Sequence, residues 1–151
     1  MKRLVFGLVL LAGCSTFDRD FEAGPLSISS AGVSDLTGRW EGTWESDENG
    51  HTGSLRCIIT QGNSDYQARY YATYTWGFIP FSFEYVIPTM AVPEGPRKSI
   101  GGAWKLRGSA ELGCWIAGGL YEYEGRVERG EYVASYRSGF DRGVFRMKRV
   151  E

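Results

Sequence analysis

This chain of 151 residues is poor in the residues from which metal and catalytic centres are usually built. It contains one histidine and three cysteines, and His51 with Cys57 and Cys114 does not have the spacing of a zinc site. It also lacks a nucleophile elbow and a glycine-rich phosphate loop. The formal net charge is −1, which argues against a nucleic-acid partner. We therefore expect neither a metal nor a cofactor.

The polar residues that remain do not form a convincing catalytic group. His51 follows Asn49 and Gly50, a dipeptide typical of hairpin turns, so we interpret it as a solvated turn residue. Glu122 and Glu124 alternate with tyrosines along one strand and are expected to project outward into solvent. We expect no catalytic residues, and the sequence predicts a protein that is not an enzyme.

Glycine and aromatic residues are abundant, with 21 Gly and 15% Phe, Trp and Tyr. Few prolines and a sustained alternation of apolar and polar residues favour an all-β domain. Eight strands are predicted, in which alternate residues of the ranges 40–44, 55–59, 66–76, 81–87, 100–106, 121–127, 132–136 and 143–147 face inward. Pro88, Pro93 and Pro96 predict a connection between the fourth and fifth strands. Short turns favour a closed antiparallel up-and-down barrel, which leaves no open edge; a two-sheet sandwich is the alternative.

The first fourteen residues have the character of an export signal. Lys2 and Arg3 precede the apolar run Leu4–Ala12, which has the length of a secretory signal core and is too short to cross a bilayer. Leu11-Ala12-Gly13-Cys14 resembles the lipobox of bacterial lipoproteins, in which the cysteine sulfur receives a diacylglyceryl group and the chain is cut before the cysteine. The resemblance implies a signal peptide over residues 1–13 and a lipid anchor on Cys14. An ordinary secretory signal is the alternative.

The lipobox resemblance implies a location in the bacterial cell envelope, where the lipid would hold the protein to a membrane. Ser15 follows the cysteine, and the absence of Asp there favours the outer membrane if the organism is Gram-negative. Residues 14–35 show no sustained period and are predicted to be a flexible tether. Residues 36–151 are then the barrel domain.

Cys57 and Cys114 are the pair that remains once Cys14 is assigned to the anchor. In an exported protein the oxidising compartment makes a disulfide between them plausible, and two buried thiols are the alternative. A bridge that closes so long a loop would stabilise the fold by roughly 4 kcal/mol in the chain-entropy model.

A second resemblance concerns the start of the first predicted strand. Gly38-Arg39-Trp40 is similar to the Gly-x-Trp signature of lipocalin-like proteins, the calycin group. In that group an arginine near the end of the last strand stacks on the tryptophan and closes the barrel, a role that the resemblance implies for Arg149. The resemblance supports a barrel and implies small-ligand binding, without identifying a ligand.

Barrel topology predicts where a ligand would bind. In an up-and-down barrel every second turn lies at the same end. One end therefore collects the turns near 46–51, 76–80, 108–118 and 138–141, and the aromatic residues on these turns mark a binding surface. The inward aromatic residues of the strands are expected to fill most of the barrel. We predict a small apolar or aromatic ligand at this end, facing away from the membrane. Its rim would be Trp76, Phe78, Trp115 and Phe140, with Tyr70, Tyr123 and Tyr136 beneath. The alternative is a protein–protein interaction or inhibitor module that uses the same loops.

Overall fold

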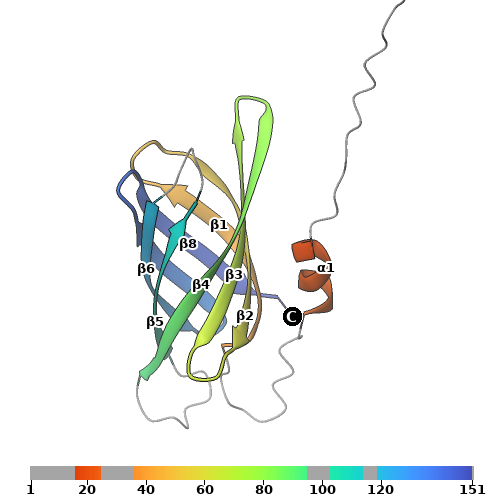
Figure 1. Cartoon of the computed structure of the whole chain (residues 1–151), viewed down its shortest axis with the longest axis vertical. Coiled ribbons are helices and arrows are strands. Elements are labelled where there is room, and N and C mark those ends of the chain that lie inside the picture. The colour runs from red at the N-terminus through yellow and green to blue at the C-terminus, as the bar shows by residue number, and fades with distance from the viewer. Residues whose placement is uncertain (1–15, 25–35, 95–102, 114–118, 151) are drawn as a thin grey trace, which may run out of the picture.

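The computed structural model describes residues 16–24, 36–94, 103–113 and 119–150. Its eight strands, each antiparallel to the next, form a closed barrel in which β8 pairs with β1 (Figure 1). The strands are β1 (Gly38–Ser46), β2 (Thr52–Gln61), β3 (Tyr66–Trp76), β4 (Ile79–Glu94), β5 (Ala103–Leu112), β6 (Gly119–Glu128), β7 (Glu131–Arg137) and β8 (Arg142–Arg149). The predicted eight-stranded up-and-down barrel is confirmed and the sandwich alternative is wrong; the architecture is consistent with a lipocalin-like fold.

The strands form because apolar and polar residues alternate along them with the period of a pleated strand. Along β7 every second residue is buried, and Tyr132, Ala134 and Tyr136 face the core while their neighbours face solvent. Glycine makes room for these side chains: a Cβ on Gly125 would lie 2.6 Å from the Cβ of Ala134 and 2.7 Å from the ring of Tyr132. A larger residue at this position of β6 would therefore displace β7 or its tyrosine.

Side chains fill the barrel through its middle and at the end where β1 begins. Among the described residues, Trp40, Tyr70 and Tyr132 are the largest side chains that are fully buried. The other buried members of this core are Leu36, Leu55, Cys57, Ile59, Ala68, Ile87, Leu106, Tyr123, Val127, Ala134, Tyr136, Phe145 and Met147. Removal of this apolar surface from water is the main favourable contribution to folding.

The end of the barrel where β1 begins is closed by Trp40 and Arg149. The two residues are register partners on β1 and β8, and the guanidinium carbon of Arg149 lies 4.7 Å from the centroid of the Trp40 ring. The indole N–H of Trp40 donates to the carbonyl of Leu36 at 3.2 Å, and Leu36 is itself fully buried. We call this end of the barrel the closed end. The stacking of Arg149 on Trp40 is the arrangement that the resemblance to lipocalin-like proteins implies.

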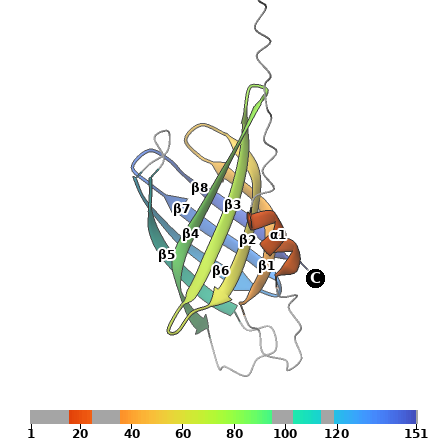
Figure 2. The same ribbon diagram turned by 45° about the vertical axis from the view of Figure 1, so that its right-hand side comes forward.

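Part of the predicted tether is folded onto the barrel. Residues Thr16–Ala23 form helix α1 on the outside of the barrel, where Phe17 and Phe21, one helical turn apart, are buried against Ile58 of β2 and Tyr71 of β3 (Figure 2). An eight-residue helix is marginal alone, so this packing holds it. The prediction of a flexible tether is wrong for these residues, and residues 14, 15 and 25–35 lie outside those described. Within the described part of the chain, no helix is long and apolar enough to cross a membrane.

The fourth strand is longer than the sequence predicts. β4 includes Pro88 and Pro93, which we expected in a connecting segment, and the third proline of that segment lies outside the described residues. Pro88 pairs with β3 but lies just beyond the ladder with β5, whereas Pro93 pairs with β5 but lies beyond the ladder with β3. A residue without an N–H is tolerated at such edges. β5 likewise continues to Leu112, into the predicted turn over 108–118.

Candidate binding site at the barrel mouth

The end opposite the closed end, which we call the mouth, carries the β1–β2, β3–β4, β5–β6 and β7–β8 connections. Because each strand runs antiparallel to the next, the four connections predicted to share one end do so. In both views the β3–β4 hairpin projects beyond the other described turns of the mouth (Figures 1 and 2). The hairpin therefore forms one raised side of the mouth.

Six inward-facing aromatic residues near the mouth are only half-buried, and we call them the aromatic wall: Trp44, Tyr74, Phe81, Phe83, Tyr85 and Tyr121. Tyr74 is central, because its ring stacks on Phe81 and Phe83 with centroids 5.3 and 5.9 Å apart, while Trp44 meets it edge-on at 6.3 Å. The indole N–H of Trp44 donates to the carbonyl of Thr73 at 2.9 Å, which fixes the indole plane. The aromatic wall thus offers ring faces and edges to an apolar or aromatic partner.

One side of the aromatic wall borders a gap in the strand ladder. β4 pairs with β5 only from Thr89 to Glu94, so among the described strands Ile79–Pro88 has β3 as its one neighbour. Phe81, Phe83 and Tyr85 all lie on this stretch. Their rings stay partly exposed because no described strand covers that edge of β4.

Tyrosines with bonded hydroxyl groups lie beneath the aromatic wall. Tyr70 stacks on Tyr85 with centroids 5.2 Å apart, and Tyr136 stacks on Tyr121 at 6.4 Å. The hydroxyl groups of Tyr70 and Tyr132 share a hydrogen bond of 2.8 Å. Burial raises the pKa of both phenols well above the usual value, so both stay neutral. Because these two hydroxyl groups are bonded to each other, neither needs a hydrogen bond from a ligand.

Two further tyrosines of the core are paired in the same way. The Tyr123 hydroxyl is hydrogen-bonded to the side chain of Thr89, and burial raises the pKa of Tyr123 to about 12. Tyr136 donates to one carboxylate oxygen of Asp141 at 3.0 Å, and the buried Ser46 hydroxyl donates to the other at 2.5 Å. These bonds tie the β1–β2 turn to the β7–β8 turn and so fix the side of the mouth away from the projecting hairpin.

The structure does not assemble the predicted rim among the residues it describes. Phe78 and Phe140 are 92% and 79% exposed, at two separate turns of the mouth. Trp115 and the side chain of Trp76 lie outside the described part of the molecule. Of the three residues predicted to lie beneath the rim, Tyr70 and Tyr136 contact the aromatic wall, through Tyr85 and Tyr121. The third, Tyr123, is buried in the core and packs edge-on against Tyr70 at 6.0 Å.

The sequence analysis did not predict the aromatic wall as a binding site. The alternation along the strands already places Tyr74, Phe81 and Phe83 inward, and their nearness to the β3–β4 turn places them at the mouth. The sequence contains no comparable signal for their partial exposure. That exposure depends on where the β4–β5 ladder ends, which is a property of the assembled barrel.

The other chemically distinctive residues are buried or dispersed. Cys57 is a free, fully buried thiol beside Tyr70, and burial raises its pKa. The predicted bridge to Cys114 is therefore not formed in this structure, and Cys114 lies outside the described residues. The described residues contain no group of three His, Cys, Asp or Glu side chains that could hold a metal ion. His51 is exposed, as expected of a turn residue, and its ring also stacks on Tyr74 at 6.1 Å, next to the aromatic wall.

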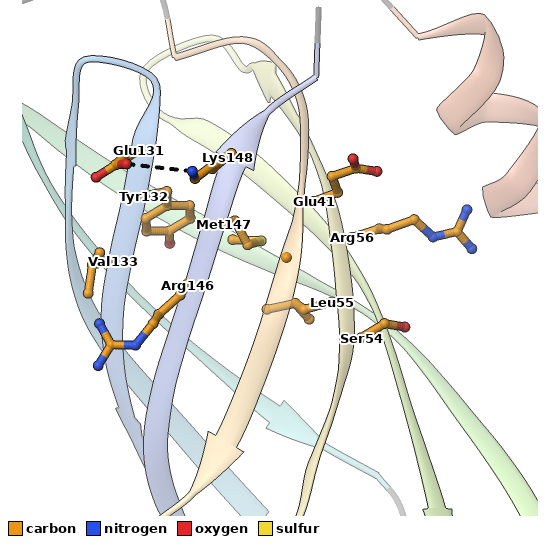
Figure 3. Close-up of a pocket in the computed structure, with 11 residues that line it drawn as sticks. Glu41, Ser54, Leu55, Arg56, Glu131, Tyr132, Val133, Arg146, Met147 and Lys148 are labelled. Carbon is orange, nitrogen blue, oxygen red and sulfur yellow. Dashed lines mark ion pairs between the residues drawn. The ribbon is translucent and has the colours of Figure 1, made fainter.

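A hollow on the outside of the barrel is a weaker candidate. Its outer lining comes from residues of β1, β2, β7 and β8 such as Glu41, Arg146 and Lys148, and the buried Leu55, Tyr132 and Met147 lie at its base (Figure 3). Arg56 and Arg146 point to opposite sides, and the ammonium of Lys148 lies 3.9 Å from the carboxylate of its neighbour on β7. Because its polar groups do not converge on one point, the hollow lacks what fixes a specific small ligand.

Comparisons with known protein families, with curated proteins and with solved structures find no match to this chain. The function must therefore be argued from the geometry of the mouth together with the features of the sequence.

Proposed function

We propose that this protein is a non-enzymatic binding module of the bacterial envelope, anchored by a lipid on Cys14, that binds a small apolar or aromatic ligand at the aromatic wall. The observation that carries the proposal is the half-burial of inward-facing rings around Tyr74. Sites for small molecules are lined mainly by such side chains. Because the hydroxyl groups of Tyr70 and Tyr136 beneath the aromatic wall are already hydrogen-bonded, we expect stacking and dispersion against the rings of that wall to be the main forces that hold the ligand. A flat, weakly polar ligand fits this surface best.

The test is titration of residues 15–151, exported without the lipid, with N-phenyl-1-naphthylamine, a neutral aromatic probe that fluoresces in apolar surroundings. We expect a saturable rise in fluorescence. Tyr74→Ala and Phe83→Ala should each weaken binding several-fold, because each removes a ring face from the stack. Native mass spectrometry of the same protein should show a natural ligand as an adduct that disappears on denaturation.

Phe78→Ala is the matched control, since it removes an equally large ring that is 92% exposed and lies outside the aromatic wall. It should leave both probe binding and the melting temperature unchanged. If Phe78→Ala or Trp115→Ala abolishes binding while Phe83→Ala does not, the predicted rim is the site instead. A wild-type protein that shows no saturable binding contradicts the proposal.

A second candidate function is a protein–protein interaction module. The observation that favours it is the exposure of Phe78 and Phe140 on two turns of the same end, because large exposed aromatic residues are typical anchors of protein interfaces. The lipid-free domain should then capture a stoichiometric partner, and Phe78→Ala combined with Phe140→Ala should lose it while probe binding at the aromatic wall is retained.

The membrane anchor is tested separately from the binding site. The full chain expressed in a bacterium should fractionate with the membrane, and its mass should report a diacylglyceryl group and loss of residues 1–13. Cys14→Ser should release the protein from the membrane fraction. Cys57→Ser should leave fractionation unchanged, because that thiol lies inside the barrel.

A further inference from the structure

Helix α1 is fastened to the barrel at the end that is nearest to Cys14 in sequence. The guanidinium of Arg69 on β3 donates to the hydroxyl of Thr16 at 3.1 Å and forms an ion pair with Asp20 at 2.7 Å. Between them, Phe17 is fully buried against the barrel. The first turn of α1 therefore has a fixed place on the outer face of β3.

This attachment shortens the link between Cys14 and the barrel. The sequence predicts a tether over residues 14–35, yet only Ser15 separates Cys14 from Thr16, where α1 begins. Consecutive Cα atoms are 3.8 Å apart, so the two steps from Cys14 to Thr16 span at most about 8 Å. A lipid on Cys14 would hold the flank of the barrel at Thr16 close to the bilayer, rather than its closed end.

The strand beside this attachment point has an apolar outer face. Arg69 is the register partner of Val86 on β4. The successive outward positions from there are Val86, Pro88, Met90 and Val92, which carry no charge and which we call the β4 stripe. Val86, Met90 and Val92 are 49%, 60% and 58% exposed. Six steps along an extended strand make the β4 stripe about 20 Å long.

No other described strand presents such a run of exposed apolar residues on its outer face. Leu120 on β6 pairs with Glu111, and Val133 on β7 lies between Arg126 and Arg146. Each of the two is the single exposed apolar side chain on the outer face of its strand, as is ordinary at a protein surface. The β4 stripe is thus the apolar flank of the barrel, and it starts where α1 is attached.

We propose that the β4 stripe, on the flank where α1 attaches, lies against the bilayer, so that the barrel rests on this flank and its mouth opens along the membrane surface. This inference rests on the proposed lipidation of Cys14, and it replaces the expectation that the mouth faces away from the membrane. The occupant is a lipid surface because a lipid at Cys14 would bring this flank nearest to one.

Two physical terms favour this contact. Burial of the apolar side chains of the β4 stripe in the interfacial region of the bilayer lowers the free energy, because it removes them from water. Lys105 and Arg107 on β5 are the register partners of Val92 and Met90, so two cations border the β4 stripe. Each forms an ion pair with a glutamate, and each can also attract an anionic lipid headgroup.

The test uses the full lipidated chain in vesicles of phosphatidylethanolamine and phosphatidylglycerol. In a Cys114→Ser background, Val92→Cys is labelled with a polarity-sensitive nitrobenzoxadiazole dye, and quenching by spin-labelled lipids is measured. Val133→Cys is the matched control, a valine of comparable exposure on another wall. Cys57 is buried and stays unlabelled. We expect several-fold stronger quenching at position 92 than at position 133.

Equal quenching at the two positions would overturn the inference. So would energy transfer between labelled copies at position 92 without lipid quenching, because the occupant would then be a second copy of the chain. Phe17→Ala combined with Phe21→Ala frees α1 and should abolish the difference; a retained difference would overturn the role of α1. A chain whose intact mass shows no lipid on Cys14 counts against the proposed function itself, and is distinguished in this way.

Discussion

Trp40 and Trp44 face the same side of the same strand, four residues apart, yet they lie in opposite surroundings. Trp40 has no exposed surface: Arg149 covers its ring at 4.7 Å and Tyr132 meets it edge-on at 6.0 Å. Trp44 is half-buried at the mouth and packs edge-on against Tyr74. One strand with one alternating pattern thus supplies a core residue at the closed end and an accessible ring at the mouth.

The difference follows from what covers each end. At the closed end, Leu36 from the chain before β1 accepts the indole N–H of Trp40, and the guanidinium of Arg149 from the end of β8 covers the indole ring. At the mouth, β4 continues past its ladder with β5, so the rings on that stretch have β3 on one side and no described strand on the other. The closed end contributes stability, and the mouth leaves aromatic surface available for binding.

The largest expected effect is a contrast between the two tryptophans. Trp40→Ala should lower the free energy of unfolding by about 3–5 kcal/mol, because it leaves a cavity in the core. Trp44→Ala should cost about 1–2 kcal/mol, since its ring is already partly in solvent. Urea unfolding of the lipid-free domain measures both. Equal losses would mean that the mouth is as much a part of the core as the closed end.

Alkaline pH should destabilise the barrel through its buried tyrosines. Burial raises the pKa of Tyr123 from 10.0 to about 12, and it also raises the pKa of Tyr70 and of Tyr132 well above the usual value. Below pH 10 both the folded and the unfolded chain keep the phenol proton, so the contribution of these tyrosines to stability is fully present. Above it the unfolded chain loses protons that the fold retains, and stability falls by up to about 1.4 kcal/mol per pH unit for each phenol.

The measurement is urea unfolding at pH values on both sides of pH 10. Tyr123→Phe removes one of the phenols and should reduce the slope above that pH. A stability that stays constant through the alkaline range would show that these hydroxyl groups are not buried as described.

Breaking the hydroxyl pair in the core should have an intermediate effect. Tyr70→Phe should cost about 1–3 kcal/mol in unfolding free energy, because it removes the hydroxyl group that shares a hydrogen bond with the buried Tyr132 hydroxyl. The double variant Tyr70→Phe/Tyr132→Phe should recover part of that loss, since no polar group is then stranded. A double-mutant cycle in urea tests this. If the losses of the two single variants add, the hydrogen bond between them is not what stabilises the pair.

The smallest effect on stability is expected from substitution of Arg149, which stacks on Trp40 at the closed end. Arg149→Met should lower the free energy of unfolding by about 0.5–2 kcal/mol through loss of the stacking on Trp40. Arg146→Met, on the same strand but exposed, should change stability little. Urea midpoints and tryptophan emission of the two variants give the comparison. A larger loss for Arg146→Met would contradict the closing role of Arg149.

Much of the barrel could be predicted from strand alternation alone. The inward set along β7 and β8, Tyr132 to Tyr136 and Gly143 to Met147, is buried as the pattern indicates. Eight strands that are recognisable in the sequence and joined by short turns are compatible with few topologies other than a closed barrel. The pairing of Trp40 with Arg149 also followed from the resemblance at the start of β1, and the two residues are register partners.

Helix α1, the length of β4 and the aromatic wall could not be predicted in this way. Phe17 and Phe21 are only two apolar residues in a short segment, and they form a helix face because Ile58 and Tyr71 provide an outer surface for them. Pro88 marks the end of one ladder and not the end of the strand, since β3 still pairs with it.

By itself, the sequence determined the all-β class, the number and inward faces of the strands, and the closure of one end, because these depend on local periodicity and on a few residues at strand ends. The tertiary structure alone decided which inward aromatic residues stay accessible and where α1 attaches. Both depend on where neighbouring ladders stop and on what packs against the outer wall. Those are contacts between segments far apart in the chain, and no periodicity within one segment encodes them.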